Sequence, residues 1–239
     1  MLIGPQNSAA DDALARNLRA LRARIEATGA AGGRNERSIT LVAVSKGHGE
    51  QRLRAAADLG VRDFGESYLQ EALLKRERLA ARALIWHFIG RVQSNKTRPI
   101  AENFDWVHGI DRLGVAERLS AQRPAALAPL QVCIQVNISA EQAKAGVAPA
   151  AAAALAADVA RLPQLRLRGL MCILPHGQKS QANRHAFAAM RLLLAHINAG
   201  QGGHLDTLSM GMSADFDDAV AEGATLVRIG TALFGARPG

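Results

Sequence analysis

ITLVAVSK, residues 39–46, is the segment around which the rest of the chain is organised. It is an unbroken apolar run rich in β-branched residues, a pattern typical of a strand that is buried on both faces in a parallel sheet. The functional groups of such sheets gather at the carboxyl ends of the strands. Because Lys46 closes the run, the segment places an amine where an active-site group would lie.

Lysine is scarce in this chain. Among 29 lysines and arginines only five are lysines, at positions 46, 75, 96, 144 and 179. Where arginine supplies nearly all the positive charge, a lysine at a strand end indicates a need for an amine that can lose its proton. The alternative is a solvated charge at a strand end, since lysine is mostly a surface residue.

The remaining sequence alternates between strand-like and helix-like segments. Further strands are predicted at residues 61–66, 84–90, 106–111, 130–138, 165–173, 204–209 and 225–230, with 130–138 the longest. Helices are predicted at residues 50–59, 68–81, 94–103, 113–122, 149–161, 182–199 and 215–222. Each of the first seven strands precedes one of these helices, and a short final helix follows the eighth, which predicts an α/β fold of the (β/α)8 TIM barrel type.

An extra helix is predicted before the first strand. Leu14, Leu18, Leu21 and Ile25 recur at helical spacing, and Ser8 with Asp11 resembles a capping box at its start. No break in composition separates domains, so residues 1–239 are predicted to form one barrel domain. A doubly wound open sheet is the competing architecture, but the phosphate-binding G-x-G-x-x-G pattern is absent after the first strand.

Composition excludes several classes of protein. The longest apolar stretches fall short of the ~20 residues that a membrane helix needs, and no signal-peptide pattern opens the chain. Cys133 and Cys172 lie in apolar runs and are predicted to be reduced core thiols of a cytoplasmic protein. No His, Cys and Asp set has metal-ligand spacing, so no metal is expected.

The net charge of +8 raises the question of nucleic-acid binding. The arginines are spread along the chain, and aromatic residues make up only 4% of it. A single-strand binder needs stacking rings beside its cations. No specific nucleic-acid partner is therefore predicted, and an anionic small ligand explains the charge.

Segments with glycine and hydroxyl side chains follow the last two strands. They are LSMGMSAD (208–215) and RIGTALFG (228–235). In barrels, the loops after strands seven and eight and a short final helix often hold a phosphate. Gly230 allows close approach of the backbone, and N–H groups of residues 230–232 would face an anion. The added hydroxyl donors would be Ser209, Ser213 or Thr231. Glycines that serve turns alone are the alternative.

A closed barrel brings these segments beside Lys46, because strand eight neighbours strand one. An amine beside a phosphate site suits a phosphorylated carbonyl compound held as a Schiff base. Pyridoxal 5′-phosphate fits this description, and so does a phosphosugar imine of the aldolase type.

Seven segments carry a resemblance to a known family. They are LVAVSK (41–46), FGExYxQE (64–71), WHFIGxxQSNKT (86–97), QVNIS (135–139), GLM (169–171), LSMGMSxD (208–215) and VRIGTxxFG (227–235). In this order they closely resemble the pyridoxal phosphate homeostasis protein family, which shares the barrel of the alanine racemase N-terminal domain. The resemblance covers residues 39–237.

The resemblance implies a site. It implies a pyridoxal phosphate aldimine on Lys46 and an Arg228 contact with the pyridine nitrogen. Phosphate contacts are implied at Ser209, Gly230 and Thr231, and further cofactor contacts are expected at His87, Met210, Gly211, Ser213 and Ser67. A core position is the alternative for His87, which lies between two aromatic residues.

Some positions depart from the family pattern. Ser67 stands where the family usually carries asparagine, and Gly47-His48 stand where a threonine and a second lysine are common. A lysine-to-lysine transfer of cofactor through position 48 is therefore not expected. Lys144 lies where the family has a lysine that accepts cofactor, with a solvated loop charge as the alternative.

We therefore predict a monomeric protein that holds pyridoxal phosphate and delivers it to apo forms of pyridoxal phosphate enzymes, with no catalytic residues of its own. The rival prediction is an amino-acid racemase or related pyridoxal enzyme. In alanine racemase a second proton donor, a tyrosine, comes from an additional domain of the partner subunit. This sequence ends at Gly239, and its sole tyrosine is Tyr68, just after the second strand.

Overall fold

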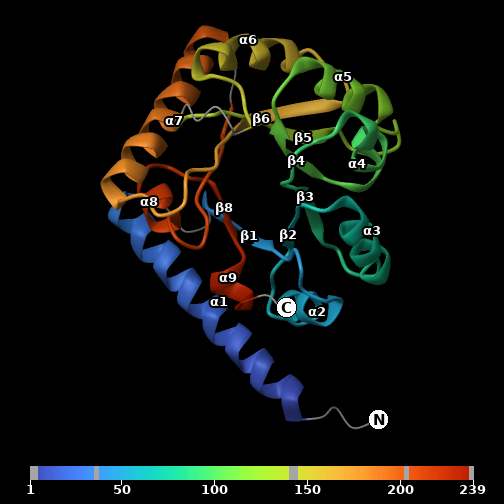
Figure 1. Cartoon of the computed structure of the whole chain (residues 1–239), viewed down its shortest axis with the longest axis vertical. Coiled ribbons are helices and arrows are strands. Elements are labelled where there is room, and N and C mark those ends of the chain that lie inside the picture. Colours follow the sequence, from blue (N-terminus) through green and yellow to red (C-terminus); the bar gives the residue numbers. More distant parts are fainter. Residues whose placement is uncertain (1–4, 35–37, 140–144, 202–204, 237–239) are drawn as a thin grey trace.

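Eight parallel strands form a closed barrel in chain order, and β8 pairs with β1 (Figure 1). The computed structural model describes residues 5–34, 38–139, 145–201 and 205–236. The strands are β1 (Thr40–Val44), β2 (Asp63–Glu66), β3 (Ile85–Phe88), β4 (Trp106–Ile110), β5 (Leu130–Gln135), β6 (Leu165–Met171), β7 (Thr207–Ser209) and β8 (Leu226–Ile229). The predicted TIM barrel is confirmed, and the run that ends at Lys46 supplies its first strand.

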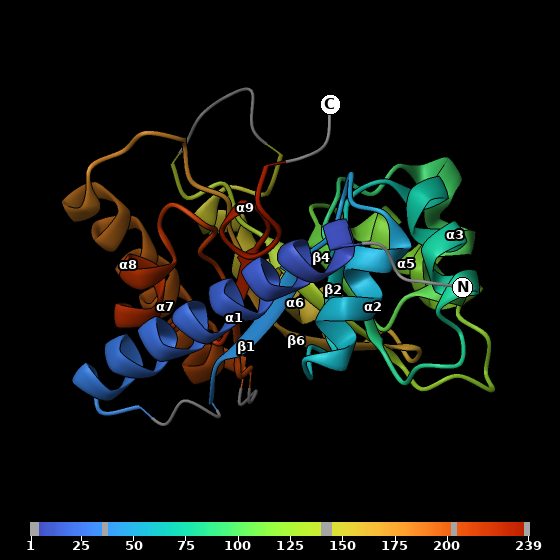
Figure 2. The ribbon, with the colours of Figure 1, turned by 90° about the horizontal axis from the view of Figure 1, so that it is seen from below.

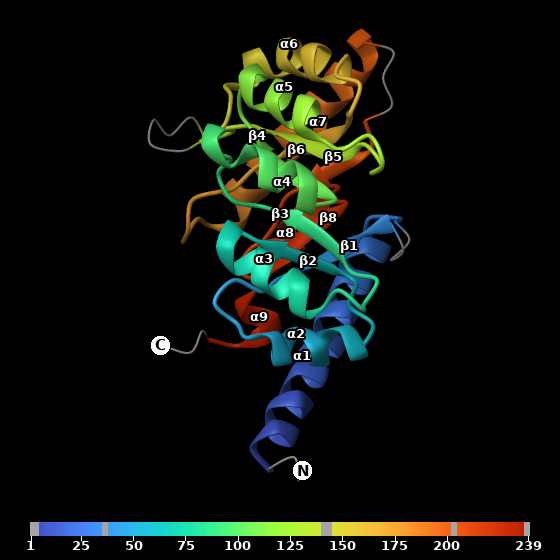
Figure 3. The same ribbon diagram turned by 90° about the vertical axis from the view of Figure 1, so that its right-hand side faces the viewer.

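Helices surround the barrel. They are α2 (Glu50–Asp58), α3 (Leu69–Arg78), α4 (Thr97–Asn103) preceded by the 3-10 turn η2 (Ser94–Lys96), α5 (Leu113–Gln122), α6 (Pro149–Ala160), α7 (Ser180–Gln201), α8 (Phe216–Ala221) and α9 (Thr231–Phe234). Figure 3 shows α3, α4 and α5 in front of the strands, where they cover that side of the barrel. No helix among the described residues is long and apolar enough to cross a membrane.

The extra helix α1 (Pro5–Ala31) runs along one side of the barrel (Figures 1 and 2). Leu14, Leu18, Leu21 and Ile25 are all buried, as their spacing predicted, and the helix packs against α8, α9 and α2. Its predicted start was wrong, because the helix already begins at Pro5 and Ser8 lies inside it. A proline suits the first turn of a helix because its missing N–H has no partner there anyway.

The longest strand is β6, which corrects the prediction for residues 130–138. The reason lies in the hydrogen bonds after Gln135. The Asn137 N–H donates to the Val147 carbonyl and the Val147 N–H to the Gln135 carbonyl, at 2.9 Å each. Residues 136–138 therefore turn toward the returning chain, and β5 ends at Gln135.

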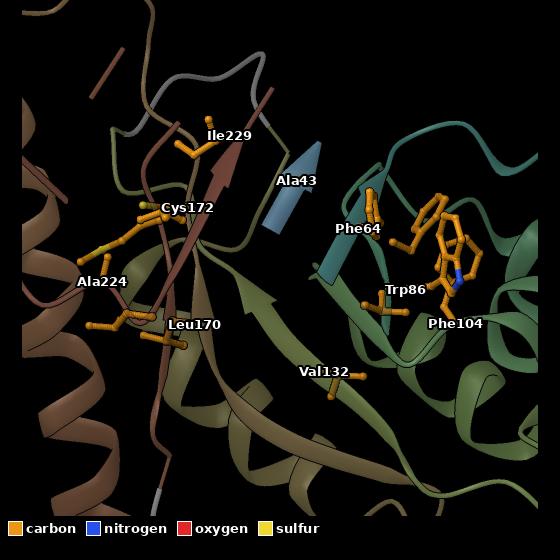
Figure 4. Packing of buried hydrophobic residues seen from close by; sticks show 14 of the residues in the cluster. Ala43, Phe64, Trp86, Phe104, Val132, Leu170, Cys172, Ala224 and Ile229 are labelled. Atoms are coloured by element: carbon orange, nitrogen blue, oxygen red, sulfur yellow. The ribbon is translucent and has the colours of Figure 1, made fainter. Parts of the chain in front are cut away.

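Aromatic rings and small apolar side chains fill the core (Figure 4). Phe64 on β2 lies 5.9 Å from Trp86 on β3, and Phe88 lies 5.3 Å from Phe104, measured between ring centroids. Figure 4 shows Phe64, Trp86 and Phe104 gathered together, with Cys172, Leu170 and Ile229 in another part of the core. Packing on both faces explains why the strands read as continuous apolar runs.

Both cysteines are free and buried, as the sequence predicted. Burial raises the pKa of the Cys133 thiol and of the Cys172 thiol to about 12. Since the thiolate is the reactive form, only about one thiol in ten thousand is ionised at pH 8. We expect neither thiol of the native protein to react with Ellman's reagent at pH 8 and both to react in guanidinium chloride. Rapid reaction of one thiol in the native protein would contradict this burial.

Candidate functional site

The carboxyl ends of the strands surround a cavity of about 530 Å³. Its lining includes six of the side chains and glycines that sequence analysis singled out: Lys46, Ser67, Ser213, Arg228, Gly230 and Thr231. A second cavity, of about 380 Å³, lies at the amino ends of β1 and β2 under α1. Because only the first cavity contains the lysine at the strand end, it is the candidate site.

Lys46 is held in place through its neighbours in the chain. The Lys75 amine on α3 donates to the Ser45 carbonyl at 2.7 Å and to Glu71 Oε1 at 2.7 Å. The same Glu71 oxygen accepts the Gly47 N–H at 2.6 Å. One cluster therefore holds the backbone on both sides of Lys46.

Glu66 completes this cluster beneath the cavity. Its Oε1 accepts the Lys75 amine at 2.6 Å and the Ser45 hydroxyl at 2.6 Å. Burial raises the pKa of the Glu66 carboxyl, against the opposing effects of Lys75 and Ser45. We call Ser45, Glu66, Glu71 and Lys75 the Lys75 cluster; it holds the backbone next to Lys46, and none of its members lines the cavity.

Sequence analysis missed the Lys75 cluster. A usable signal was present, because Glu71 and Lys75 are four residues apart on one helix and pair at that spacing. Glu66, at the carboxyl end of β2, was the other part of that signal. Lys75 is 6% exposed, and lysine is rarely that buried without a charged partner.

The segments after β7 and β8 meet at one end of the cavity. Gly230 packs closely on β1, because a Cβ at this position would lie 3.4 Å from the Val44 carbonyl oxygen. Thr231 begins α9, and the first N–H groups of a helix have no partner within it. The Ser213 hydroxyl accepts the Ala232 N–H at 3.2 Å, so this N–H, which the sequence assigned to an anion, already has a partner.

Arg228 reaches the cavity from the barrel wall. Its guanidinium donates through Nη1 to the Ser209 hydroxyl at 2.7 Å and through Nη2 to the Cys172 carbonyl at 2.8 Å. The side chain is 3% exposed, and burial lowers its pKa. A guanidinium nevertheless keeps its proton in proteins, so Arg228 is a fixed donor.

Ser209, for which a phosphate contact was expected, does not line the cavity. This residue ends β7 with its side chain fully buried, where the hydroxyl contacts Arg228 and His108. Ser213, four residues later, lies at the cavity instead. The sequence does not distinguish these two serines, because they differ only in the direction in which each side chain points.

Three other expected contacts also lie away from the cavity lining. Met210 and His87 are fully buried in the core and the barrel interior. Gly211 adopts φ +92°, and a Cβ there would come within 2.6 Å of Ala219 Cβ, so this glycine serves the turn.

His48 packs on Phe234 with ring centroids 5.0 Å apart. Lys144 lies outside the described residues.

Sequence analysis assigned no role to four polar residues that line the cavity, although Asp215 belongs to the quoted segment 208–215. They are His176, Gln178, Asn183 and Asp215. His176 and its neighbours belong to the loop between β6 and α7, whose length and polarity were the only signal. Within the described part of the chain, no group of three His, Cys, Asp or Glu side chains could hold a metal ion.

The donor set fits a phosphorylated aldehyde. Ser213 and Thr231 offer hydroxyls at one end of the cavity, and Thr231 adds an N–H group at the start of α9, a donor set that suits an anion. Lys46 offers an amine, which is the group that reacts with an aldehyde. Arg228 offers a charged donor in the lining of the same cavity.

Comparison with known proteins agrees with this fit. The family model for the alanine racemase N-terminal domain matches residues 11–238. A protein of Pseudomonas aeruginosa named pyridoxal phosphate homeostasis protein is 56% identical over 225 residues, 94% of this chain and 96% of the relative. The Escherichia coli K12 protein of the same name is 48% identical over 228 residues, 94% of this chain and 97% of the relative.

Solved structures show the same barrel. PipY of Synechococcus elongatus PCC7942, determined with PLP bound, is 37% identical with a TM-score of 0.82, covering 93% of this chain and all of PipY. Alanine racemase from Corynebacterium glutamicum is 19% identical with a TM-score of 0.68, covering 95% of this chain and 62% of the racemase. The second likeness concerns the fold alone.

Proposed function

Because the chain belongs to the pyridoxal phosphate homeostasis protein family, we propose that it binds pyridoxal 5′-phosphate covalently through Lys46. In this proposal the protein is an intracellular monomer that holds the cofactor and passes it to apo forms of pyridoxal phosphate enzymes. The observation that best supports this proposal is that Lys46 lines the same cavity, of about 530 Å³, as Ser213, Arg228, Gly230 and Thr231.

Each residue has a defined task in this proposal. Lys46 bonds to the aldehyde carbon, and the Lys75 cluster fixes the backbone from which Lys46 extends. Ser213, Gly230 and Thr231 hold the phosphate, and Arg228 faces the pyridine nitrogen. When bound, pyridoxal phosphate supplies a reactive carbonyl and an electron-withdrawing ring.

The absorption spectrum tests the proposal directly. Adding pyridoxal phosphate should produce a visible band that borohydride removes, and mass spectrometry of the reduced protein should find the added mass on the peptide that contains Lys46. The aldolase-type rival predicts instead that borohydride traps a phosphosugar. Trapping of a phosphosugar with no visible band would replace the proposed cofactor.

Transfer of pyridoxal phosphate to a recipient enzyme can be measured by mixing the two proteins. The protein loaded with pyridoxal phosphate is incubated with the apo form of a pyridoxal phosphate enzyme, together with a trap for free cofactor. Activation faster than release into the trap would support direct delivery. Activation at the rate of free release would contradict it.

We expect the phosphate end to discriminate between pyridoxal phosphate and pyridoxal. Ser213→Ala with Thr231→Val removes two hydroxyl donors, each worth roughly 1.5–3 kcal/mol toward a charged acceptor. The double variant should bind pyridoxal phosphate at least about a hundredfold more weakly and bind pyridoxal as the wild type does. Thr40→Val, at the amino end of β1, is the matched control. Equal weakening for both ligands would move the phosphate elsewhere.

We expect no turnover of amino acids at an enzymatic rate. Arg228 keeps the ring nitrogen unprotonated, which makes the ring a poorer electron sink. Tyr68 is 61% exposed and does not line the cavity, so it is not poised as a second proton donor. The loaded protein is incubated with L-alanine and L-serine while D-isomers and keto acids are followed. Turnover near the typical ~1–10³ s⁻¹, lost in Lys46→Ala, would favour the racemase-like rival.

A further inference from the structure

A chain of polar side chains crosses the barrel interior from its amino end to Arg228. Its members come from four strands: Asp63 (β2), His87 (β3), His108 (β4) and Ser209 (β7). Asp63 Oδ1 lies 3.0 Å from His87 Nε2, and His87 Nδ1 lies 2.9 Å from His108 Nε2. His108 Nδ1 lies 2.7 Å from Ser209 Oγ, which accepts from Arg228 at 2.7 Å. The phosphate and covalent contacts proposed above use none of these four side chains.

The hydrogen bonds of this chain all point in one direction. Arg228 has only donors, so the Ser209 oxygen accepts from it and the Ser209 O–H donates to His108 Nδ1. His108 then carries its proton on Nε2 and donates to His87 Nδ1. His87 in turn carries its proton on Nε2 and donates to the Asp63 carboxylate.

The opposite direction leaves a group unsatisfied. If His108 donated to Ser209 through Nδ1, the Ser209 oxygen would accept twice and its own O–H would need another acceptor. In the described part of the chain, the Ser209 hydroxyl has only the two neighbours Arg228 and His108. An unsatisfied buried hydroxyl is costly, so the direction from Arg228 to Asp63 is preferred.

The chain also joins two charges at opposite ends of the barrel. Among the described residues no carboxylate lies within 4.0 Å of the Arg228 guanidinium, although Asp215 acts on it from a greater distance. The Asp63 side chain, 20% exposed, ends the chain at the cavity under α1. Between them, burial holds the pKa of His108 far below its usual value, with His87 and Arg228 adding to the effect, so this ring is neutral. In a series of hydrogen bonds between a cation and an anion, each bond polarises the next one and strengthens it.

We propose that Asp63, His87, His108 and Ser209 form a one-directional hydrogen-bonded chain that positions the Arg228 guanidinium at the cavity. Its effect on the cofactor ring rests on the proposed function, whereas the chain itself belongs to the protein without ligand. These four are positioning residues, because none of them lines the cavity that contains Lys46.

The direction is tested by nitrogen NMR on the ligand-free protein. With ¹⁵N-labelled histidine, and assignment through single His→Gln variants, both His87 and His108 should be neutral with the proton on Nε2. Slow rotation of the Arg228 guanidinium, seen as resolved Nη–H signals, should accompany this. An Nδ1–H form of either ring, or freely rotating guanidinium groups, would overturn the proposal.

Asp63→Asn tests whether the far charge acts on Arg228. The amide oxygen still accepts from His87, so the fold is kept while the negative charge is lost. We expect faster rotation of the Arg228 guanidinium and a Kd for pyridoxal phosphate that is about three- to tenfold higher. Asp58→Asn makes the same change at a side chain that is 63% exposed and paired with Arg82.

The outcomes separate the two proposals. Equal guanidinium rotation in Asp63→Asn and Asp58→Asn would show that the chain does not position Arg228. Failure of the wild type to bind pyridoxal phosphate would refute the proposed function, while the NMR signals of the ligand-free protein would still decide the chain.

Discussion

Lys46→Ala is expected to abolish the visible band that the wild-type protein gives with pyridoxal phosphate, while the thermal unfolding midpoint stays unchanged. Lys46 is the one lysine of the described residues that lines the cavity. Lys75 is bonded to Glu66, Glu71 and Ser45 beneath it. The fold should tolerate the change, because Lys46 is only partly buried and lies two residues beyond the end of β1.

Two control variants make this result interpretable. Lys46→Arg keeps the positive charge but provides no amine for a covalent bond, so it should also lack the band while still binding the phosphate end. Lys96→Ala, in the turn before α4, removes a lysine away from the cavity and should leave the band intact. A band that survives in Lys46→Ala would assign the covalent bond to another lysine, with Lys144 the next to test.

The fold was predictable because both faces of each strand are packed. Residues 113–122 were predicted as a helix and form α5 with the same bounds. Strand ends were less predictable. Residues 204–209 were predicted as a strand, but Leu205 and Asp206 lie before β7 (Thr207–Ser209), and residue 204 is outside the described residues. Where a strand stops depends on hydrogen bonds to distant segments, such as the one between Val147 and Gln135, which local periodicity does not contain.

The position of Lys46 at the cavity followed from one rule about parallel strands. The sequence did not distinguish Ser209, inside the barrel, from Ser213, at the cavity, because that difference depends on the direction of each side chain. Sequence analysis also did not predict the Lys75 cluster or the hydrogen-bonded chain that runs from Asp63 to Ser209. Their members come from different strands and helices and meet only after the barrel closes, as with His108 and Ser209, 101 residues apart.

Lys75→Met is expected to destabilise the protein by about 3–5 kcal/mol, the usual loss when one partner of a buried ion pair is removed. The Lys75 amine donates to Glu66, Glu71 and the Ser45 carbonyl, and the Glu66 side chain is fully buried. The second oxygen of Glu66 has no hydrogen-bond partner among the described residues, so Lys75 is its main compensation. Unfolding in guanidinium chloride measures the loss.

Matched variants separate the charge from the packing. In Lys75→Met with Glu66→Gln, no carboxylate remains at position 66, so the loss should be smaller than in Lys75→Met alone. Lys96→Met changes the same residue type in the turn η2 and should alter stability little. Equal losses in the single and double variants would show that Lys75 acts through its aliphatic stem rather than through its charge.

The loss of stability in Lys75→Met should depend on pH. Burial already raises the pKa of Glu66 in the folded protein, and Lys75 opposes that rise. Folding therefore favours the protonated carboxyl, and this contribution, complete below the unfolded pKa, is lost as pH increases through the folded pKa. Removing Lys75 raises the folded pKa further, so the loss in Lys75→Met should be larger at pH 8 than at pH 5. A loss that is larger at pH 5 would mean that removing Lys75 lowers the pKa of Glu66, and hence that Lys75 does not stabilise the Glu66 carboxylate.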